Sequence, residues 1–165
     1  MFTVEKQEGQ TKKELYETLN AQMGALLEGE TDLIANLANA SALLNQVLDE
    51  INWVGFYLVK NDELLLGPFQ GKVACVHIPI GRGVCGTAVA QDQTQVVWDV
   101  HQFEGHIACD SASRSEIVIP MHHEGEIIGV LDIDSPITGR FTEEDALYLE
   151  ACVRTIENAC FKSSL

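Results

Sequence analysis

Three cysteines are candidates for chemistry because none belongs to the apolar face of an expected helix. Cys75, Cys85 and Cys109 each lie near polar or glycine-rich stretches, and Cys109 is flanked by Ala108 and Asp110 in a long polar segment. A cysteine thiolate is a strong nucleophile, and a second cysteine can condense with the sulfenic acid that the first one forms. The pattern indicates thiol redox chemistry, with Cys109 as the candidate nucleophile.

Each cysteine also has a structural interpretation. Cys75 alternates with apolar residues in KVACVHI, which is equally typical of a strand residue that faces the core. Cys85 lies where GRGVCG enters a helix, where a thiolate is stabilised but where a crowded turn also favours a small residue. Cys152 and Cys160 lie on the apolar stripe of the last expected helix, and we predict that both are core residues.

Carboxylates form a second group of candidates. Asp132 and Asp134 alternate along EIIGVLDIDS, on the face that is expected to carry Ile128 and Val130 as well. If EIVIPM pairs back on this strand through a tight turn, Glu116 is placed opposite or diagonal to Asp132 or its neighbour. The hairpin therefore predicts three carboxylates at one end, just past the Cys109 segment.

Such a cluster needs a cation, which could be a metal ion or the ammonium group of a substrate. One acid could also remain protonated, because like charges raise a pKa, and could then act as a general acid. Trp53 and Tyr57 share a face of the expected strand WVGFYLV and could wall such a pocket against a sulfoxide methyl group. The alternatives are a solvated strand end, with Asp134 capping a turn, and ordinary core aromatics.

Helices at both ends of the chain are expected to position these groups. A capping box at Thr11-x-x-Glu14 begins the first helix, Gly29 separates it from a second that opens near Asp32, and Thr142-x-x-Asp145 caps the last. The expected strands between them are WVGFYLV, ELLLGPF, KVACVHIPI, QVVWDV, EIVIPM and EIIGVLDIDS.

A helical interlude, GRGVCGTAVAQ, interrupts these strands, and the 15 residues of HQFEGHIACDSASRS form the longest loop. The order of elements predicts an α+β class in a single domain, residues 1–165, with the terminal helices on one face of an antiparallel sheet.

The composition excludes several function classes. The 165 residues carry a net charge of −15 and 46% hydrophobic residues, a globular balance whose surface repels nucleic acid and anionic lipid. The N-terminal stretch has no apolar run of signal-peptide length, and no stretch approaches a membrane span, so we expect a cytoplasmic protein. Structural disulfides are rare in the cytosol, so the cysteines need another explanation.

The spacing of Cys75, Cys85 and Cys109 occurs together with the sequence motifs GRGVCG, HIACD, SRSEIVIP, GVLDIDSP and NWVGFYL. In this combination the chain closely resembles the free methionine-(R)-sulfoxide reductases, single-domain enzymes of the GAF fold, over essentially its whole length. The resemblance implies a six-stranded antiparallel sheet with helices packed on one side, a homodimer built largely through helices, and no metal or organic cofactor. It also implies that thioredoxin is the reductant and that the protein acts in repair after oxidative stress.

The resemblance also implies roles for individual residues. Cys109 is the thiol that attacks free methionine (R)-sulfoxide, Cys75 is the preferred resolving partner, and Cys85 is an accessory or alternative resolving thiol. The substrate-binding residues implied by the resemblance are Glu116, Asp132, Asp134, Trp53 and Tyr57.

A further expectation concerns reactivity. Carboxylates near Cys109 oppose thiolate formation in the empty site, and Arg114 offsets part of this effect, so the thiol is expected to become activated when the substrate ammonium binds.

Two other functions are compatible with the residues. One is a GAF sensor module that binds a small molecule without turnover. The other is a zinc site made of Cys75, His77, His106 and Cys109, although these residues lack the paired CxxC spacing of strong zinc sites.

Overall fold

The computed structural model describes residues 2–4, 8–107 and 111–161. Its helices are α1 (Lys12–Leu27), α2 (Leu33–Val47), α3 (Gly83–Gln91) and α4 (Glu143–Cys160), together with a 3₁₀ turn, η1 (Val100–Gln102). Its strands are β1 (Trp53–Lys60), β2 (Glu63–Gly71), β3 (His77–Pro79), β4 (Gln95–Val97), β5 (Ser115–His123) and β6 (Glu126–Ser135).

The helices begin where the sequence predicts because polar side chains cap them. The Thr11 hydroxyl accepts a hydrogen bond from the Glu14 amide, and the Asp32 carboxylate accepts one from the Ala35 amide at 2.8 Å. Thr142 and its N3 residue form the predicted capping box at the start of α4. Each cap satisfies amides that the first helical turn leaves without acceptors.

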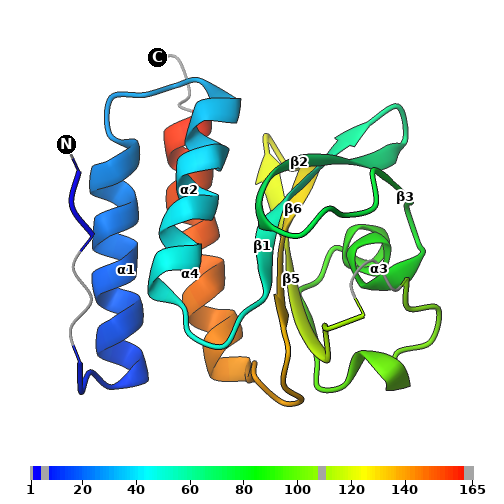
Figure 1. Ribbon diagram of the computed structural model, residues 1–165. Coiled ribbons are helices and arrows are strands. Elements are labelled where there is room, and N and C mark those ends of the chain that lie inside the picture. The colour runs from blue at the N-terminus through cyan, green and yellow to red at the C-terminus, as the bar shows by residue number, and fades with distance from the viewer. Residues whose placement is uncertain (1, 5–7, 108–110, 162–165) are drawn as a thin grey trace.

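One antiparallel sheet forms the centre of the molecule, with the strand order β3-β2-β1-β6-β5-β4. Helices α1, α2 and α4 lie together on one side of it, and the short α3 lies on the other (Figure 1). The predicted α+β class and six-stranded antiparallel sheet are confirmed, and the packing of helices on one side holds for the three long helices.

Two apolar clusters fill the two sides of the sheet. The larger lies under α1, α2 and α4 and includes Phe56, Leu131 and Ile133. The smaller lies under α3 and includes Trp53 and Tyr57. Because side chains alternate along a strand, β1 sends Trp53 and Tyr57 to the α3 side and Phe56 to the long helices.

The expected strand KVACVHIPI is shorter than predicted, since only His77–Pro79 pairs as β3. Residues 72–76 instead cross over the α3 side of the sheet, where two aromatic side chains bind their backbone. Trp53 Nε1 donates to the Lys72 carbonyl at 3.1 Å, and the Tyr57 hydroxyl donates to the Cys75 carbonyl at 2.9 Å. These bonds connect positions far apart in sequence, which a local apolar pattern cannot reveal.

The expected face of β6 is wrong at one position. Val130 lies in the cluster under α3 as predicted, but Ile128 packs against the cluster under the long helices. The cause is a β-bulge, because Met121 pairs with Gly129 and the next residue of β5 pairs with Ile127, which leaves Ile128 unpaired. An extra residue in one strand reverses the alternation beyond it.

Gly55 allows β1 and β2 to approach closely beside the site. A Cβ atom at Gly55 would lie 2.3 Å from the Phe69 Cβ, so a side chain here would push the two strands apart. We expect Gly55→Ala to lower the free energy of unfolding by about 1–3 kcal/mol, as overpacking does. Urea unfolding would measure this. Gly24→Ala is the control, because that Cβ would meet only Thr155, at 3.8 Å, and alanine favours the helix by up to about 1 kcal/mol.

None of the helices in the described ranges combines the length and apolar character that crossing a membrane requires.

Candidate active site

The hairpin of β5 and β6 brings the three predicted carboxyl groups together. Glu116 pairs directly with Asp134, and Asp132 is two residues away on the same face of β6. The register differs from the predicted one because the turn pairs His123 with Glu126 and the bulge at Ile128 adds one more residue. Glu116 nevertheless remains diagonal to Asp132. Proximity of the three acids is therefore confirmed.

These carboxyls line a cavity between the sheet and α3. The aromatic pair of β1, the first turn of α3 and the segment before β5 complete its wall. The lining residues are Trp53, Tyr57, Ala74, Ile78, Gly83, Val84, Cys85, His106, Ile107, Ser113, Glu116, Asp132 and Asp134.

Burial dominates the electrostatics of the cavity. Glu116 is 7% exposed and Asp132 is 5% exposed. Burial raises the pKa of all three carboxyl groups, and the charge of Asp132 raises the pKa of Glu116 and Asp134 further. Hydrogen bonds from Glu116 and Cys85 lower the pKa of Asp132 and so offset part of the effect of burial. The cluster therefore holds protons far more readily than exposed carboxyls do.

Two oxygen atoms of the cluster are left without partners. The Oδ1 atoms of Asp132 and Asp134 are buried and make no hydrogen bond within the part of the chain that the structure describes. Both residues line the cavity. A buried acceptor without a donor is costly, so these atoms indicate a donor-rich, cationic occupant.

Trp53 and Tyr57 form the apolar wall, as predicted. Both are nearly fully buried, and their rings stack at 5.9 Å between centroids, with Phe69 stacked 5.1 Å from Trp53 on the other side. Their polar atoms already bind the backbone of residues 72–76, so the two side chains present mainly their apolar ring surfaces to the cavity.

The five cysteines fall in different surroundings. Cys75 is half-buried in the segment after β2 and is engaged in a disulfide bond. Cys85, Cys152 and Cys160 are free thiols. Cys152 is a buried core residue as predicted, and Cys160 is half-buried and packs against the same cluster. Cys109 lies outside the described residues.

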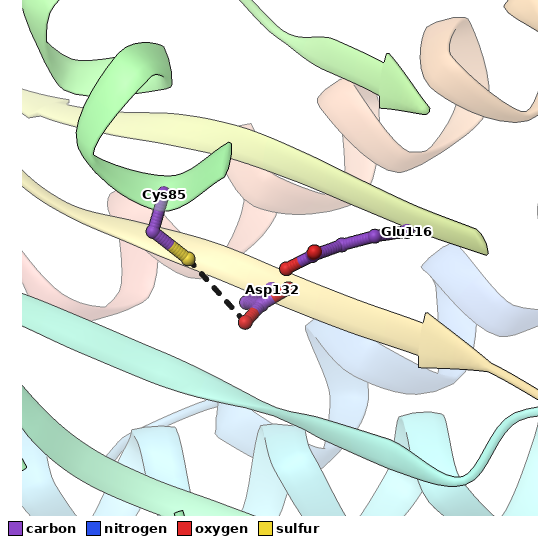
Figure 2. Close-up of side chains that lie close together, drawn as sticks. All are labelled: Cys85, Glu116 and Asp132. Carbon is purple, nitrogen blue, oxygen red and sulfur yellow. Dashed lines mark hydrogen bonds between the residues drawn. The ribbon is translucent and has the colours of Figure 1, made fainter. Parts of the chain in front are cut away.

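Cys85 projects from α3 toward Asp132, with Glu116 beside them (Figure 2). Its Sγ donates a hydrogen bond to Asp132 Oδ2 at 3.3 Å. Burial raises the pKa of the Cys85 thiol, and the charges of Asp132, Glu116 and Asp134 raise it further. The position at the helix entrance is as predicted, but the surroundings disfavour a thiolate.

His106 is a lining residue whose sequence position suggests only a zinc ligand. Its Nε2 lies 4.0 Å from a carboxylate oxygen of Glu116, and burial lowers its pKa. Ser113, which no sequence pattern indicates, is buried in the lining of the same cavity and accepts a hydrogen bond from the Asn52 side chain at 3.1 Å. In the sequence, only the HIACD motif indicates that His106 lies near the site.

The proposed zinc ligands that the structure describes, Cys75, His77 and His106, do not form a metal-binding group. His77 lies on the exposed edge strand β3, where its Nδ1 is 2.5 Å from the Glu63 carboxylate. Arg114, expected to offset the acidic charge, is exposed and does not line the cavity.

One set of potential metal ligands exists in the described part of the chain. Ligand atoms of Cys85, Glu116 and Asp132 lie within 4.8 Å of one another. Metal ligands must lose their protons, and burial raises the pKa of each of these three groups. Their donor set therefore fits a hydrogen-bonded acid cluster better than a metal centre.

Comparison with known proteins agrees with this geometry. Residues 11–160 match the GAF domain family. The chain is 60% identical over 146 residues to the free methionine-R-sulfoxide reductase of Escherichia coli, covering 88% of each protein.

Solved structures agree as well. The reduced form of fRMsr from Staphylococcus aureus superposes with a TM-score of 0.87 at 60% identity, covering 92% of this chain and 96% of that one. The free methionine-R-sulfoxide reductase of Neisseria meningitidis in complex with its substrate gives a TM-score of 0.92 at 46% identity, covering 96% and 95%. The chain belongs to the GAF-domain family of free methionine-R-sulfoxide reductases.

Proposed function

We propose that this protein reduces free methionine-(R)-sulfoxide to methionine, with Cys109 as the attacking thiol. The observation that carries the proposal is the buried cavity itself, in which three carboxyls of one hairpin face an aromatic wall. This arrangement is found in a chain whose relatives are reductases of that compound.

The acid cluster supports a substrate with a free ammonium group. An ammonium group offers three N–H donors and a full positive charge, which match the unpartnered Oδ1 atoms of Asp132 and Asp134. It would also relieve the repulsion among the acids. A methionine residue within a peptide has a neutral amide nitrogen at that position and offers no such charge.

The opposite wall supports a substrate with a free carboxylate. Gly83, Val84 and Cys85, in the first turn of α3, line the cavity, and the side chain of the N-cap residue Arg82 makes no capping hydrogen bond. Amides in the first turn of a helix have no acceptor within the helix, and they favour anions. Acids from the hairpin together with amides from the first turn of α3 would suit a zwitterionic amino acid.

The reaction follows from these groups. The Cys109 thiolate attacks the sulfoxide sulfur, and a protonated acid of the cluster donates a proton to the sulfoxide oxygen. The oxygen is transferred to the cysteine sulfur, so methionine leaves and Cys109 becomes a sulfenic acid. The Cys75 thiol then condenses with it, which forms a disulfide and releases water. The thiols supply both electrons, so the cycle needs no cofactor.

The state of Cys75 supports its role as the resolving thiol, because it is already engaged in a disulfide, whereas Cys85 is free. The neighbouring side chains support reduction by another protein. Val73 is 89% exposed and Val76 is 51% exposed, so apolar surface flanks the half-buried Cys75. We assign thioredoxin, in the cytoplasm, as the dithiol that restores the enzyme, and a homodimer through the helical side as its assembly.

Modified substrates test the proposal. Acetylation of the substrate nitrogen removes the charge that the cluster binds, so we expect kcat/KM for N-acetylmethionine-(R)-sulfoxide to be about 10²-fold lower than for the free amino acid. The methyl ester of methionine-(R)-sulfoxide, which keeps the ammonium group, is the control and should lose less. Methionine formed is measured by chromatography.

Equal rates with the acetylated and free compounds would contradict the role of the acid cluster. Binding of the free compound without any methionine formed would instead favour a GAF sensor module.

A further inference from the structure

We propose that Tyr57 and Trp53 are positioning residues of the resolving step, in which their hydroxyl and indole N–H groups hold the chain segment that carries Cys75 beside the substrate cavity. The inference rests on the proposed function and deepens it, because resolution requires the Cys75 thiol to meet the sulfenic acid formed in that cavity. It assigns to the polar atoms of the two side chains a role distinct from that of their rings, which form the apolar wall.

Two hydrogen bonds from β1 hold the backbone of residues 72–76. This segment, which lies entirely within the described residues, forms neither helix nor strand. The Tyr57 hydroxyl donates to the Cys75 carbonyl at 2.9 Å, and Trp53 Nε1 donates to the Lys72 carbonyl at 3.1 Å. Without the hydrogen-bonded ladder of a strand, a segment depends on such side-chain bonds for its position.

The chain on either side of the segment is fixed. Gly71, at the end of β2, has a φ of 139°, and a Cβ atom there would lie 2.6 Å from Trp53 Cδ1, so only glycine lets the chain pass this close to the indole ring. At the other end, the Leu66 amide of β2 donates to the Val76 carbonyl at 2.9 Å. The bond from Tyr57 therefore acts on Cys75 between two anchored ends.

The Tyr57 hydroxyl is a dependable donor. Burial raises the pKa of Tyr57, and the charge of Asp132 raises it further, so the hydroxyl keeps its proton. The rings of Tyr57 and Trp53 are nearly fully buried and stack with centroids 5.9 Å apart. This packing fixes the direction in which both polar atoms point.

The segment is itself part of the cavity wall. Ala74 lines the cavity together with Trp53 and Tyr57, so Cys75 directly follows a residue that borders the substrate site. The side chains that form the apolar wall for the substrate thus also set the place of the resolving cysteine.

The resolving step joins two sulfur atoms. The Cys75 sulfur attacks the sulfur of the Cys109 sulfenic acid, an S–S bond forms as the S–O bond breaks, and the oxygen leaves as water with the thiol proton. In the structure Cys75 is engaged in a disulfide while both hydrogen bonds to its segment are made. The bonds therefore fit the product of this step, and holding a reacting group in a geometry close to the product speeds its formation.

Tyr57→Phe tests the inference because it removes the hydroxyl group and keeps the ring. Equilibration with reduced and oxidised glutathione, without substrate, gives the effective concentration of the Cys75 thiol toward its disulfide partner. We expect this concentration to fall about 10-fold, as the loss of one hydrogen bond predicts. No effect of the ring on substrate binding enters this measurement.

A kinetic measurement follows the resolving step itself. During a first turnover without reductant, a reagent that traps sulfenic acids should capture the Cys109 sulfenic acid about 10-fold longer in Tyr57→Phe than in the wild type. The ratio of the resolving rate to the rate of methionine formation should therefore fall. Trp53→Phe, which removes the indole N–H group, should change both readouts in the same direction.

Tyr16→Phe is the matched control. The Tyr16 hydroxyl is also buried and donates to Asp145 Oδ1 at 2.7 Å, but it lies under the long helices, on the other side of the sheet. Its loss should lower the free energy of unfolding, measured in urea, and leave the glutathione equilibrium and the lifetime of the sulfenic acid unchanged.

An unchanged effective concentration or an unchanged sulfenic acid lifetime in Tyr57→Phe would overturn the inference. Equal changes in Tyr16→Phe would overturn it as well, because they would arise from general loss of stability. If Tyr57→Phe does not fold, the same two measurements on Trp53→Phe decide.

Failure of the proposed function would look different, because the wild-type protein itself would then form no methionine. The glutathione equilibrium needs no substrate, so it would still compare the wild type with Tyr57→Phe, and equal values would refute the positioning of Cys75.

Discussion

Replacing Cys109 with serine is expected to lower turnover of free methionine-(R)-sulfoxide by about 10³-fold or more, because a neutral hydroxyl is a far weaker nucleophile than a thiolate. Both the first turnover and the steady state should fail, since the variant cannot make the first bond to sulfur. NADPH consumption coupled through thioredoxin and its reductase measures the steady state, and chromatography of methionine measures the first turnover.

Cys75→Ser should behave differently, and the contrast identifies the two roles. This variant keeps the attacking thiol, so it should form about one methionine per enzyme and then stop as a sulfenic acid that has no resolving partner. Cys160→Ser is the matched control on α4, with full activity expected. Substantial steady-state turnover by Cys109→Ser would exclude the proposed chemistry.

Glu116→Gln is expected to make the protein more stable and less active. The variant keeps the shape of the side chain but removes a buried acid that lies directly opposite Asp134. We expect kcat/KM to fall about 10²-fold, because the cluster loses an acid that binds the substrate ammonium when ionised and supplies a proton when protonated. The free energy of unfolding should rise by on the order of 1 kcal/mol near pH 8, because an unpaired acid no longer has to be buried.

The pH dependence gives the sign of the stability change. The pKa of Glu116 is raised in the folded state by burial and by its acidic neighbours, so the folded protein holds a proton that the unfolded chain releases. This contribution is complete below the pKa of the unfolded chain, near 4.3, and is lost as pH rises through the folded pKa. The stabilisation by Glu116→Gln should therefore be larger at pH 8 than at pH 5.

Thermal unfolding at both pH values, with and without substrate, would measure these effects. Glu126→Gln is the control, because Glu126 is an exposed carboxyl at the far end of β6 and should change neither stability nor activity. If the Glu116→Gln protein were less stable than the wild type at pH 8, the conclusion that burying Glu116 among other acids destabilises the fold would be contradicted.

Much of the fold and several site residues followed from local sequence patterns. Caps at Thr11, Asp32 and Thr142 begin three helices where predicted, because each cap bonds to amides only three residues away. Alternation along a single strand placed Asp132 and Asp134 on one face for the same reason. Interactions of such short range depend on neighbouring residues, which the sequence displays directly.

The partners of these groups depended on the tertiary structure. The hairpin turn and the bulge at Ile128 together set which residue faces Glu116, and the bond between Cys85 and Asp132 connects α3 to β6. His106 reaches the cavity from a segment whose local pattern shows no burial. These contacts join residues distant in the chain through sheet register and helix docking. Their energy comes from burial and packing, which only the assembled fold creates.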